Sequence, residues 1–278
     1  MPLLIYYELL KTYRKLRTYI GFALILVMTP LVYWGLSYAG PDIVGGMTRR
    51  FERDFILVGS LFNGWFVSHF AMNTLWVHIP FLIVLAAGDA FSGEATSGTF
   101  RMLLTRPPSR TKIFAVKTIG TTMYTLSLVI FLAILTLGLG LILFGSGDLL
   151  ALQEGIAIIP QGELWWRVLF AYFLAGFGMC VVASIAMLFS ALVENAIGPI
   201  VGAMAVHIIF MILGNLPFEF FETIRPYLYT SYLNIWQEAF NDPVDWMLLL
   251  RHATYLAVFF SMFTGTAWFI FRRKDILS

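Results

Sequence analysis

The stretch "TLSLVIFLAILTLGLGLILF", residues 125–144, decides the class of protein to which this chain belongs. It contains no charged side chain, and a helix needs about 20 mostly apolar residues to cross the hydrocarbon core of a bilayer. The whole chain of 278 residues is 59% hydrophobic and 12% charged, with a mean hydropathy of +0.82. A soluble fold, in which about 45–50% of residues are apolar, could not cover this much apolar surface. We therefore expect an integral membrane protein.

Six such runs are spread along the chain and predict six transmembrane helices. The runs are uniformly apolar and longer than the ~10-residue alternating segments of a membrane β-barrel, so the expected fold is all-α and polytopic. Residues 55–65 are also apolar, and they either extend the second span or form a separate interfacial helix. The expected spans are residues 19–38, 66–88, 113–144, 166–192, 196–214 and 246–271.

The distribution of basic residues predicts the orientation. Lys and Arg near the ends of spans remain preferentially on the cytoplasmic side. With six spans, twelve of the 18 basic residues lie on the side that carries both termini and residues 89–112, so we expect that side to be cytoplasmic. These twelve are Lys11, Arg14, Lys15, Arg17, Arg101, Arg106, Arg110, Lys112, Lys117, Arg272, Arg273 and Lys274.

Two segments outside the spans have an interfacial composition. Residues 1–18 predict an amphipathic helix that lies in the membrane interface with its cations toward anionic lipid, although a short basic flank that only orients the first span is an equal alternative. Residues 215–245 are too charged to span and rich in Phe, Tyr and Trp. Because aromatic rings with a polar edge favour the headgroup level, we expect short helices folded back onto the outer membrane surface.

Side chains that could carry chemistry are scarce inside the expected spans. No Asp, Glu, Lys or Arg lies near the middle of a span, and the ionisable groups at depth are His69, His78 and His207. His69 shares a helical face with Asn73, and a histidine in a bundle is more often a hydrogen-bonded packing residue than a functional one. Secondary transporters usually have buried ionisable groups or broken helices, and the sequence reveals neither.

Other classes of site lack a motif as well. Three dispersed histidines and the single cysteine, Cys180, provide neither a metal cluster nor an intrachain disulfide. The sequence contains no G-x-S-x-G, no H-E-x-x-H and no G-x-x-x-x-G-K-[ST], the P-loop that binds ATP. We expect no catalytic residue, no metal and no cofactor on this chain, which is then not an enzyme. Energy for uphill transport would have to enter from another polypeptide.

A polar segment, "FSGEATSGTFRMLLTRPPSR" at residues 91–110, interrupts the apolar sequence between the second and third spans. It predicts a turn, a short amphipathic helix, a stiff corner and a cap for the third span. A helix held between two spans would transmit a push to both, which favours a docking role; a basic loop that only fixes topology is the alternative. The residues concerned are Gly93 and Gly98, Phe100, Leu103 and Leu104, Pro107 and Pro108, and Ser109.

Residues 88–117 resemble the signature of the ABC-2 type transporter permease family. In that family a span ends in a Gly/Ser-Gly-Glu element, followed by Gly-Thr, a Leu pair, a Pro-x-Ser-Arg corner and a Lys that opens the next span. The matching residues are Ser92-Gly93-Glu94, Gly98-Thr99, Leu103-Leu104, Pro107-Pro108-Ser109-Arg110 and Lys117. The six spans, the interfacial N-terminal helix and residues 226–240, which look like those of small bacterial export permeases, extend the likeness over most of the chain. Only residues 88–117 are specific.

The resemblance implies a single ABC-2 type, ABCG-like transmembrane domain over residues 1–278, the permease subunit of a bacterial exporter in the inner (plasma) membrane. A separate nucleotide-binding ATPase would hold ATP and Mg, and a second permease copy or a paralogue would complete a dimer surrounded by lipid; no nucleic acid is implied. Residues 89–112 would be the coupling segment, with Glu94 as a docking or bracing carboxylate. The implied coupling residues are Gly93, Glu94, Gly98, Thr99, Phe100, Arg101, Leu103, Leu104, Arg106 and Arg110, to which Glu194 and Asn195 would add a second contact.

Two other functions stay open at this point. A channel or secondary transporter would act in vesicles without ATP or a partner, and a membrane scaffold or sensor would hold a cytosolic protein without moving a solute. The G-x-x-x-G of Gly198 and Gly202 allows close helix packing inside the subunit or in a dimer. The apolar spans suit a lipid-like, drug-like or peptide cargo, but spans that merely face lipid would have the same composition.

Overall fold

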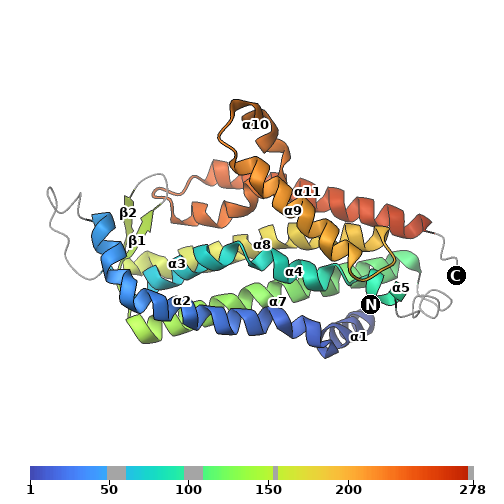
Figure 1. Cartoon of the computed structure of the whole chain (residues 1–278), viewed down its shortest axis with the longest axis horizontal. Helices are drawn as coiled ribbons and strands as arrows, with labels where there is room; N and C mark the ends of the chain where they lie inside the picture. Colours follow the sequence, from blue (N-terminus) through green and yellow to red (C-terminus); the bar gives the residue numbers. More distant parts are fainter. Residues whose placement is uncertain (49–60, 97–108, 153–155, 275–278) are drawn as a thin grey trace.

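The computed structural model describes residues 1–48, 61–96, 109–152 and 156–274. Long helices run side by side along the longest axis, and α10 projects from one side of this bundle, between its two ends (Figure 1). The elements are α1 (Pro2–Arg14), α2 (Leu16–Thr48), α3 (Gly64–Trp76), α4 (Ile79–Ala87), α5 (Ser92–Thr96), α7 (Arg110–Phe144), β1 (Leu149–Leu152), β2 (Ile156–Ile159), α8 (Gln161–Leu192), α9 (Gly198–Asn215), α10 (Glu219–Ile224), the 3-10 helices η1 (Arg225–Tyr227) and η2 (Tyr229–Phe240), and α11 (Trp246–Arg273).

The fold is that of a mostly helical, polytopic membrane protein. Within the described ranges, α2, α7, α8, α9 and α11 are long and apolar enough to cross a membrane, and the bent pair α3 and α4 would make a sixth span. The spans expected at 19–38, 113–144, 166–192 and 246–271 fall within α2, α7, α8 and α11, whereas 66–88 extends one residue beyond α4 and 196–214 begins two residues before α9. The first outer loop was expected to begin after residue 38, but α2 continues to Thr48, and residues 49–60 lie outside the described part.

The second span is broken, which the sequence analysis did not anticipate. The axes of α3 and α4 differ by 52° across Val77 and His78. Pro80, in the first turn of α4, has no backbone N–H for the carbonyl of Trp76, and its ring crowds that carbonyl. The expectation of a continuous helix over residues 66–88, and of a bundle without a broken helix, is therefore corrected.

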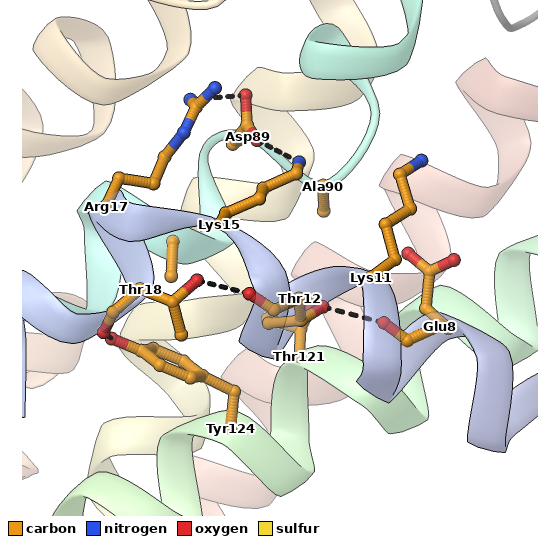
Figure 2. A pocket seen from close by; sticks show the side chains of 11 residues that line it. Glu8, Lys11, Thr12, Lys15, Arg17, Thr18, Asp89, Ala90, Thr121 and Tyr124 are labelled. Carbon is orange, nitrogen blue, oxygen red and sulfur yellow. Dashed lines mark hydrogen bonds and ion pairs between the residues drawn. The ribbon is translucent and has the colours of Figure 1, made fainter.

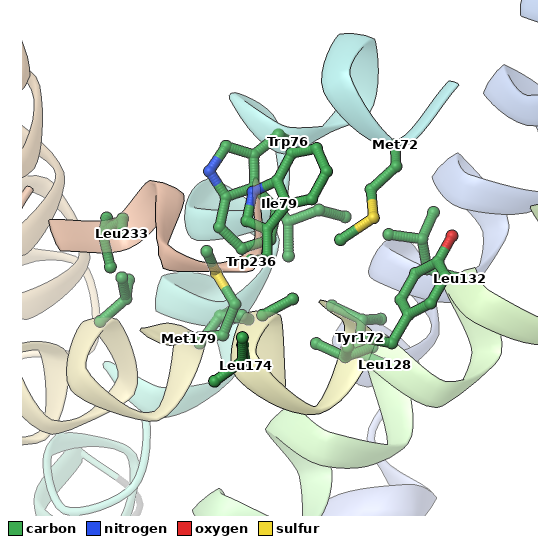
Figure 3. Close-up of a cluster of buried hydrophobic side chains, with 14 of the residues drawn as sticks. Met72, Trp76, Ile79, Leu128, Leu132, Tyr172, Leu174, Met179, Leu233 and Trp236 are labelled. Atoms are coloured by element: carbon green, nitrogen blue, oxygen red, sulfur yellow. The ribbon is translucent and has the colours of Figure 1, made fainter. Parts of the chain in front are cut away.

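The helix α8 is the centre of the bundle. It contacts α4, α7, α9, α11 and η2, and most of its apolar span is buried. Small residues recur along it, and they let neighbouring helices approach closely. Trp76 of α3 and Trp236 of η2 pack against each other, with 5.6 Å between their ring centroids. In Figure 3, Met179 and Leu174 reach from α8 toward these rings, so α8 joins both elements in one core.

Residues 215–245 form short helices, but they are not all at the surface. Phe220 on α10 is exposed, whereas Tyr229, Trp236 and Phe240 of η2 are buried. The helix η2 packs against α8 and α11. The expectation of short helices lying on the outer membrane surface therefore does not hold for η2, because its aromatic side chains find protein partners in the bundle instead of lipid headgroups.

A small antiparallel hairpin, β1 and β2, connects α7 to α8. Leu149 pairs with Ile159, and both side chains are fully buried. The backbone N–H of Gly64 donates to Gly145 O (2.8 Å), and the Asn63 amide donates to Asp148 O (2.7 Å), so the start of α3 fixes the hairpin. The hairpin is an addition to the expected all-α fold.

Candidate functional site

Seven charged side chains meet at one end of the bundle, where α1 and the start of α2 lie beside the end of α4, α5 and the first turns of α7. We call this set the charged cluster: Glu8, Lys11, Lys15, Arg17, Asp89, Glu94 and Lys117. The side chains of Asp89 and Glu94 are 3% exposed and that of Lys117 is 2% exposed. Buried charges are tolerated only when they are paired and hydrogen-bonded, so each of these three requires partners.

Lys117 connects α7 to both α1 and α5. Its ammonium donates to Glu94 Oε1 (2.6 Å), to Glu8 Oε1 (3.0 Å) and to the carbonyl of Ala90 (2.8 Å). An ammonium has three donors, and all three are used. Glu94 also accepts a hydrogen bond from Lys11 on α1. The first turns of α7 are therefore fixed to α1 and α5 through one buried network.

Asp89 forms the second half of the charged cluster, in the turn between α4 and α5. Its carboxylate binds Lys15 Nζ at 2.5 Å and Arg17 Nη1 at 2.6 Å, and both pairs are visible in Figure 2. Gly93 leaves the room for this carboxylate, because a Cβ at that position would lie 2.2 Å from Asp89 Oδ1. The motif glycine therefore permits an ion pair that anchors the junction of α1 and α2.

The ionisation of Glu94 follows from two opposing effects. Burial acts to raise the pKa of its carboxyl, but the positive charges of Lys117 and Lys11 outweigh it and hold that pKa below its usual value. Glu94 is therefore charged at neutral pH. Since the carboxylate is enclosed by its own chain, the geometry favours a bracing role over direct docking.

The helix α1 presents its polar side to the protein. Lys11 and Lys15, which had been expected to face anionic lipid, bind Glu94 and Asp89. Tyr13 adds a hydrogen bond between its hydroxyl and Ser127 Oγ of α7 (2.6 Å). The exposed side chains of α1 include Tyr6 and Tyr7. The buried carboxylates explain this orientation. Leaving them buried without a cation would be costly, whereas lysines at the membrane surface can be solvated without lipid contacts.

The helix α5 is also bound to the turn between α8 and α9. Ser190 Oγ accepts hydrogen bonds from the backbone N–H groups of Phe91 and Ser92, each at 3.0 Å. The hydroxyl of Thr96 donates to the carbonyl of Glu194 (3.1 Å). The predicted second contact, Glu194 and Asn195, thus lies next to the coupling segment.

Arg110 has an intramolecular role at the end of α11. Its Nη1 donates to the carbonyls of Arg272 (3.1 Å) and Lys274 (2.7 Å). The last carbonyls of a helix lack partners within the helix and carry a partial negative charge. A guanidinium there donates hydrogen bonds to these carbonyls and also offsets their charge. The start of α7 and the end of α11 are consequently held together.

Seven of the ten coupling residues that the resemblance implies belong to residues 97–108. Gly98, Thr99, Phe100, Arg101, Leu103, Leu104 and Arg106 lie outside the described residues. The residues that the sequence analysis missed are Glu8, Asp89 and the bracing role of Lys117. One signal was present: an ionisable residue about two turns inside an apolar helix, as Lys117 is, usually has a specific partner.

Two of the three histidines at depth, His69 and His207, are hydrogen-bonded packing residues. The His69 ring contacts the Asn73 amide (3.1 Å), and the His207 ring contacts the hydroxyl of Tyr229 (2.9 Å). His78 lies in the break between α3 and α4 and is exposed. Across the described ranges, no three His, Cys, Asp or Glu side chains come together as metal ligands would.

Fold and site together define a polytopic α-helical membrane protein with a buried ionic brace at one end of its bundle. The sequence profile of one protein family, described as protein of unknown function (DUF2705), matches residues 44–277, and the chain belongs to this family. No curated protein matches the chain. The family match covers the coupling segment, but its description assigns no activity.

Proposed function

We propose that this chain is the permease subunit of an ABC-2 type ATP-binding cassette exporter. A separate nucleotide-binding subunit would bind ATP and Mg, dock on residues 89–112 and drive transport across a bacterial inner membrane. The direction of transport rests on the resemblance of residues 88–117 to that permease family. With six spans, α3 and α4 counted as one, both termini and the coupling segment would lie on the same, more basic side, which in this proposal is the cytoplasmic one.

The observation that carries this proposal is the buried pair of Glu94 and Lys117 (2.6 Å). The segment between the second and third spans is joined through Glu94 to α7 and α1, through Asp89 to the start of α2, and through Thr96 to the turn before α9. A loop that only fixed the topology would need none of these connections. A displacement of residues 97–108 by a docked ATPase would therefore move several helices together.

The thermodynamic requirement is differential binding. A partner shifts a conformational equilibrium only by the difference between its affinities for the two states. In this proposal the ATPase binds the coupling segment more tightly in one nucleotide state, and the charged cluster converts that difference into a tilt of α1 and α7. The network is well suited to this because buried ion pairs lose several kcal/mol when separated, about 3–5 when one partner is removed.

A second permease copy, or a paralogue, would complete the membrane domain. The apolar helix α9 is poorly covered by its own chain, with Val201, Ile209 and Ile212 exposed. On the same side, α10 exposes the carboxylates of Glu219 and Glu222 between the two ends of the bundle (Figure 1). Charged groups at that depth are costly in lipid, so this side is better suited to a protein partner or an aqueous path.

The experiment is to co-express the chain with a P-loop ATPase, if one is encoded in a neighbouring reading frame, and to measure co-purification and ATP turnover in proteoliposomes. We expect Gly98→Pro to abolish co-purification. Glu94→Gln should keep the complex but lower the permease-dependent ATP turnover about tenfold, because the brace is weakened while the docking surface is kept. Asp42→Asn, which neutralises an exposed carboxylate on α2, is the matched control. Unchanged turnover in Glu94→Gln, or failure of the ATPase to bind the wild-type chain, would contradict the proposal.

One observation favours a second function. The break at Val77 and His78 is the kind of discontinuity at which secondary transporters bind substrates and ions. A secondary transporter would produce flux in vesicles that contain the chain alone, driven by a proton or sodium gradient and insensitive to ATP. Such flux would replace the exporter proposal, whereas its absence together with ATPase binding would support it.

A further inference from the structure

A cavity of about 460 Å³ opens where the second span is broken. Its walls come from the end of α3, the start of α4, the second half of α9, and η1 and η2. Pockets of about 300–1,000 Å³ are typical of small-molecule sites. We call this cavity the break pocket.

The break pocket contains polar groups that the protein does not satisfy. Arg225 Nε and Thr230 Oγ1 are buried without a hydrogen-bond partner among the described residues. Ser231 and Asn234 line the same cavity and are exposed. Both atoms are enclosed by protein, so the polar groups that a ligand in the cavity would meet first are the Ser231 hydroxyl and the Asn234 amide.

Side-chain amides from α3 and η2 add to the polar lining of the break pocket. The Gln237 amide donates to Asn73 Oδ1 (2.9 Å), and the Asn73 amide in turn contacts His69 Nε2 (3.1 Å). This chain of bonds holds two side-chain amides in place in the wall of the break pocket, and Asn234 supplies a third. Because each amide has a donor and an acceptor, it is complementary to a peptide group.

Part of the lining of the break pocket is apolar. Trp76, Val77, Pro80, Met211 and Leu233 contribute to it. Trp76 is held from behind by Trp236, as Figure 3 shows, so its ring is a fixed surface. The break pocket thus combines amide and hydroxyl groups with a hydrophobic wall.

Arg225 supplies the one permanent charge among the described lining residues. Its Nη2 donates to the carbonyl of Leu216 (2.8 Å), which places it at the end of α9, and Nη1 lies 3.7 Å from Glu222. The carboxylate neutralises Arg225 only in part, because that contact is long and Glu222 is exposed. The guanidinium can therefore still bind one anionic group.

We propose that the break pocket binds the C-terminal end of a hydrophobic peptide, with its carboxylate at Arg225, its peptide groups at Asn234 and Gln237 and its side chains against Trp76. As the site of a transported substrate it rests on the proposed exporter function. As a binding site it is a property of this chain alone.

The length of the break pocket favours a peptide over an anionic lipid. His207 and Asn215 both line it, and eight residues of helix correspond to about 12 Å. A lipid with its phosphate at Arg225 would extend hydrocarbon along this length and leave the Asn234 amide and Gln237 Oε1 without a hydrogen-bond partner. A peptide carries a donor and an acceptor at every residue and can bond to these groups along the whole pocket.

The test uses the purified full-length chain in phosphatidylcholine nanodiscs and two probes, the tripeptide N-acetyl-Leu-Leu-Phe as the free acid and as the C-terminal amide. Binding is measured by isothermal titration calorimetry. We expect saturable binding of the acid and about tenfold weaker binding of the amide, the loss of one charge-assisted hydrogen bond. Arg225→Gln should remove the difference between the probes, and Gln237→Leu should weaken both. Arg251→Gln, which changes an exposed arginine on α11, is the matched control.

Each outcome decides the proposal. No saturable binding of either probe, equal binding of acid and amide to the wild-type chain, or complete displacement of the acid by anionic phosphatidylglycerol would overturn it, the last in favour of a lipid site. Because no ATPase is present, binding of the acid would stand even if the exporter proposal failed. Conversely, an ATPase that couples through Glu94 while the tripeptide fails to bind would leave the exporter and remove the peptide site.

Discussion

Glu94 on α5 and Lys117 on α7 form a buried ion pair of 2.6 Å, and Lys117 extends the same network to Glu8 on α1. These three helices come from the N-terminus, the segment after the second span and the third span. The pair therefore connects the motif around Glu94 to helices that are far from it in the sequence. It also makes the charged cluster sensitive to the loss of any single member.

Lys117→Met is expected to lower the free energy of unfolding by about 3 kcal/mol. The substitution leaves the buried Glu94 and the partly exposed Glu8 with fewer partners, and breaking a buried pair from one side costs about 3–5 kcal/mol. Lys11 still contacts Glu94, so the lower end of this range applies. The measurement is denaturant unfolding in micelles, followed by circular dichroism.

The double variant Glu94→Leu/Lys117→Met controls for simple loss of packing. It removes both charges, and such replacements are often neutral or stabilising. We expect most of the stability to return, while the permease-dependent ATP turnover stays low. A double variant that is less stable than Lys117→Met would show that the pair contributes more than it costs to bury.

The thermal stability of the chain should fall at acidic pH. The folded pKa of Glu94 is lowered, so its contribution is complete above the unfolded value of about 4.3 and is lost as the pH falls through the lower, folded value. We expect a flat melting temperature from about pH 7 to 5 and a decline below about pH 4. In Glu94→Gln this part of the decline should disappear. An equally steep decline in the variant would assign the acid sensitivity to other carboxylates.

Gly93→Ala should disturb the second half of the charged cluster. A Cβ at Gly93 would lie 2.2 Å from Asp89 Oδ1, so the carboxylate must move away from Lys15 and Arg17. We expect a loss of about 1–3 kcal/mol in the free energy of unfolding. Gly35→Ala is the matched control, because its Cβ would meet nothing within 4 Å and the site is helical. The control should be neutral or gain about 0.4–1 kcal/mol, and equal losses in both variants would contradict the steric argument.

The spans were predictable because lipid imposes a simple requirement. About 20 apolar residues must be continuous in the sequence, and residues 125–144 satisfy this without any knowledge of tertiary structure. The break in the second span was harder to predict from the sequence, although Pro80 gave a signal. Proline kinks a transmembrane helix, but the size of the kink depends on the packing of neighbouring helices. The burial of η2 depends on the space between α8 and α11, which no local pattern encodes.

The candidate site was predictable only as a motif. The sequence placed Glu94 and Gly93 in the right segment, and the structure adds why both are there: one binds Lys117, and the other leaves room for Asp89. The ion pairs join residues 23 to 109 positions apart, so they depend on how each helix is rotated about its axis. That rotation follows from packing of the whole bundle, and a single sequence does not specify it.

The G-x-x-x-G of α9 is expected to stabilise the subunit itself. A Cβ at Gly202 would lie 2.9 Å from the ring of Phe189 on α8, and one at Gly198 would lie 2.9 Å from Asn195, so both glycines face their own chain. Gly202→Val should therefore lower the free energy of unfolding by about 1–3 kcal/mol, with Gly35→Val as the control for valine in an open helical position.

Adding Phe189→Ala to Gly202→Val should restore part of that loss, because the smaller side chain on α8 makes room for the valine. The association of permease copies, measured by dilution in micelles with single-molecule photobleaching, should be the same in Gly202→Val as in the wild-type chain. If the valine instead reduces association and leaves unfolding unchanged, then the glycine face lies between two copies, and α9 must rotate away from α8 when the dimer forms.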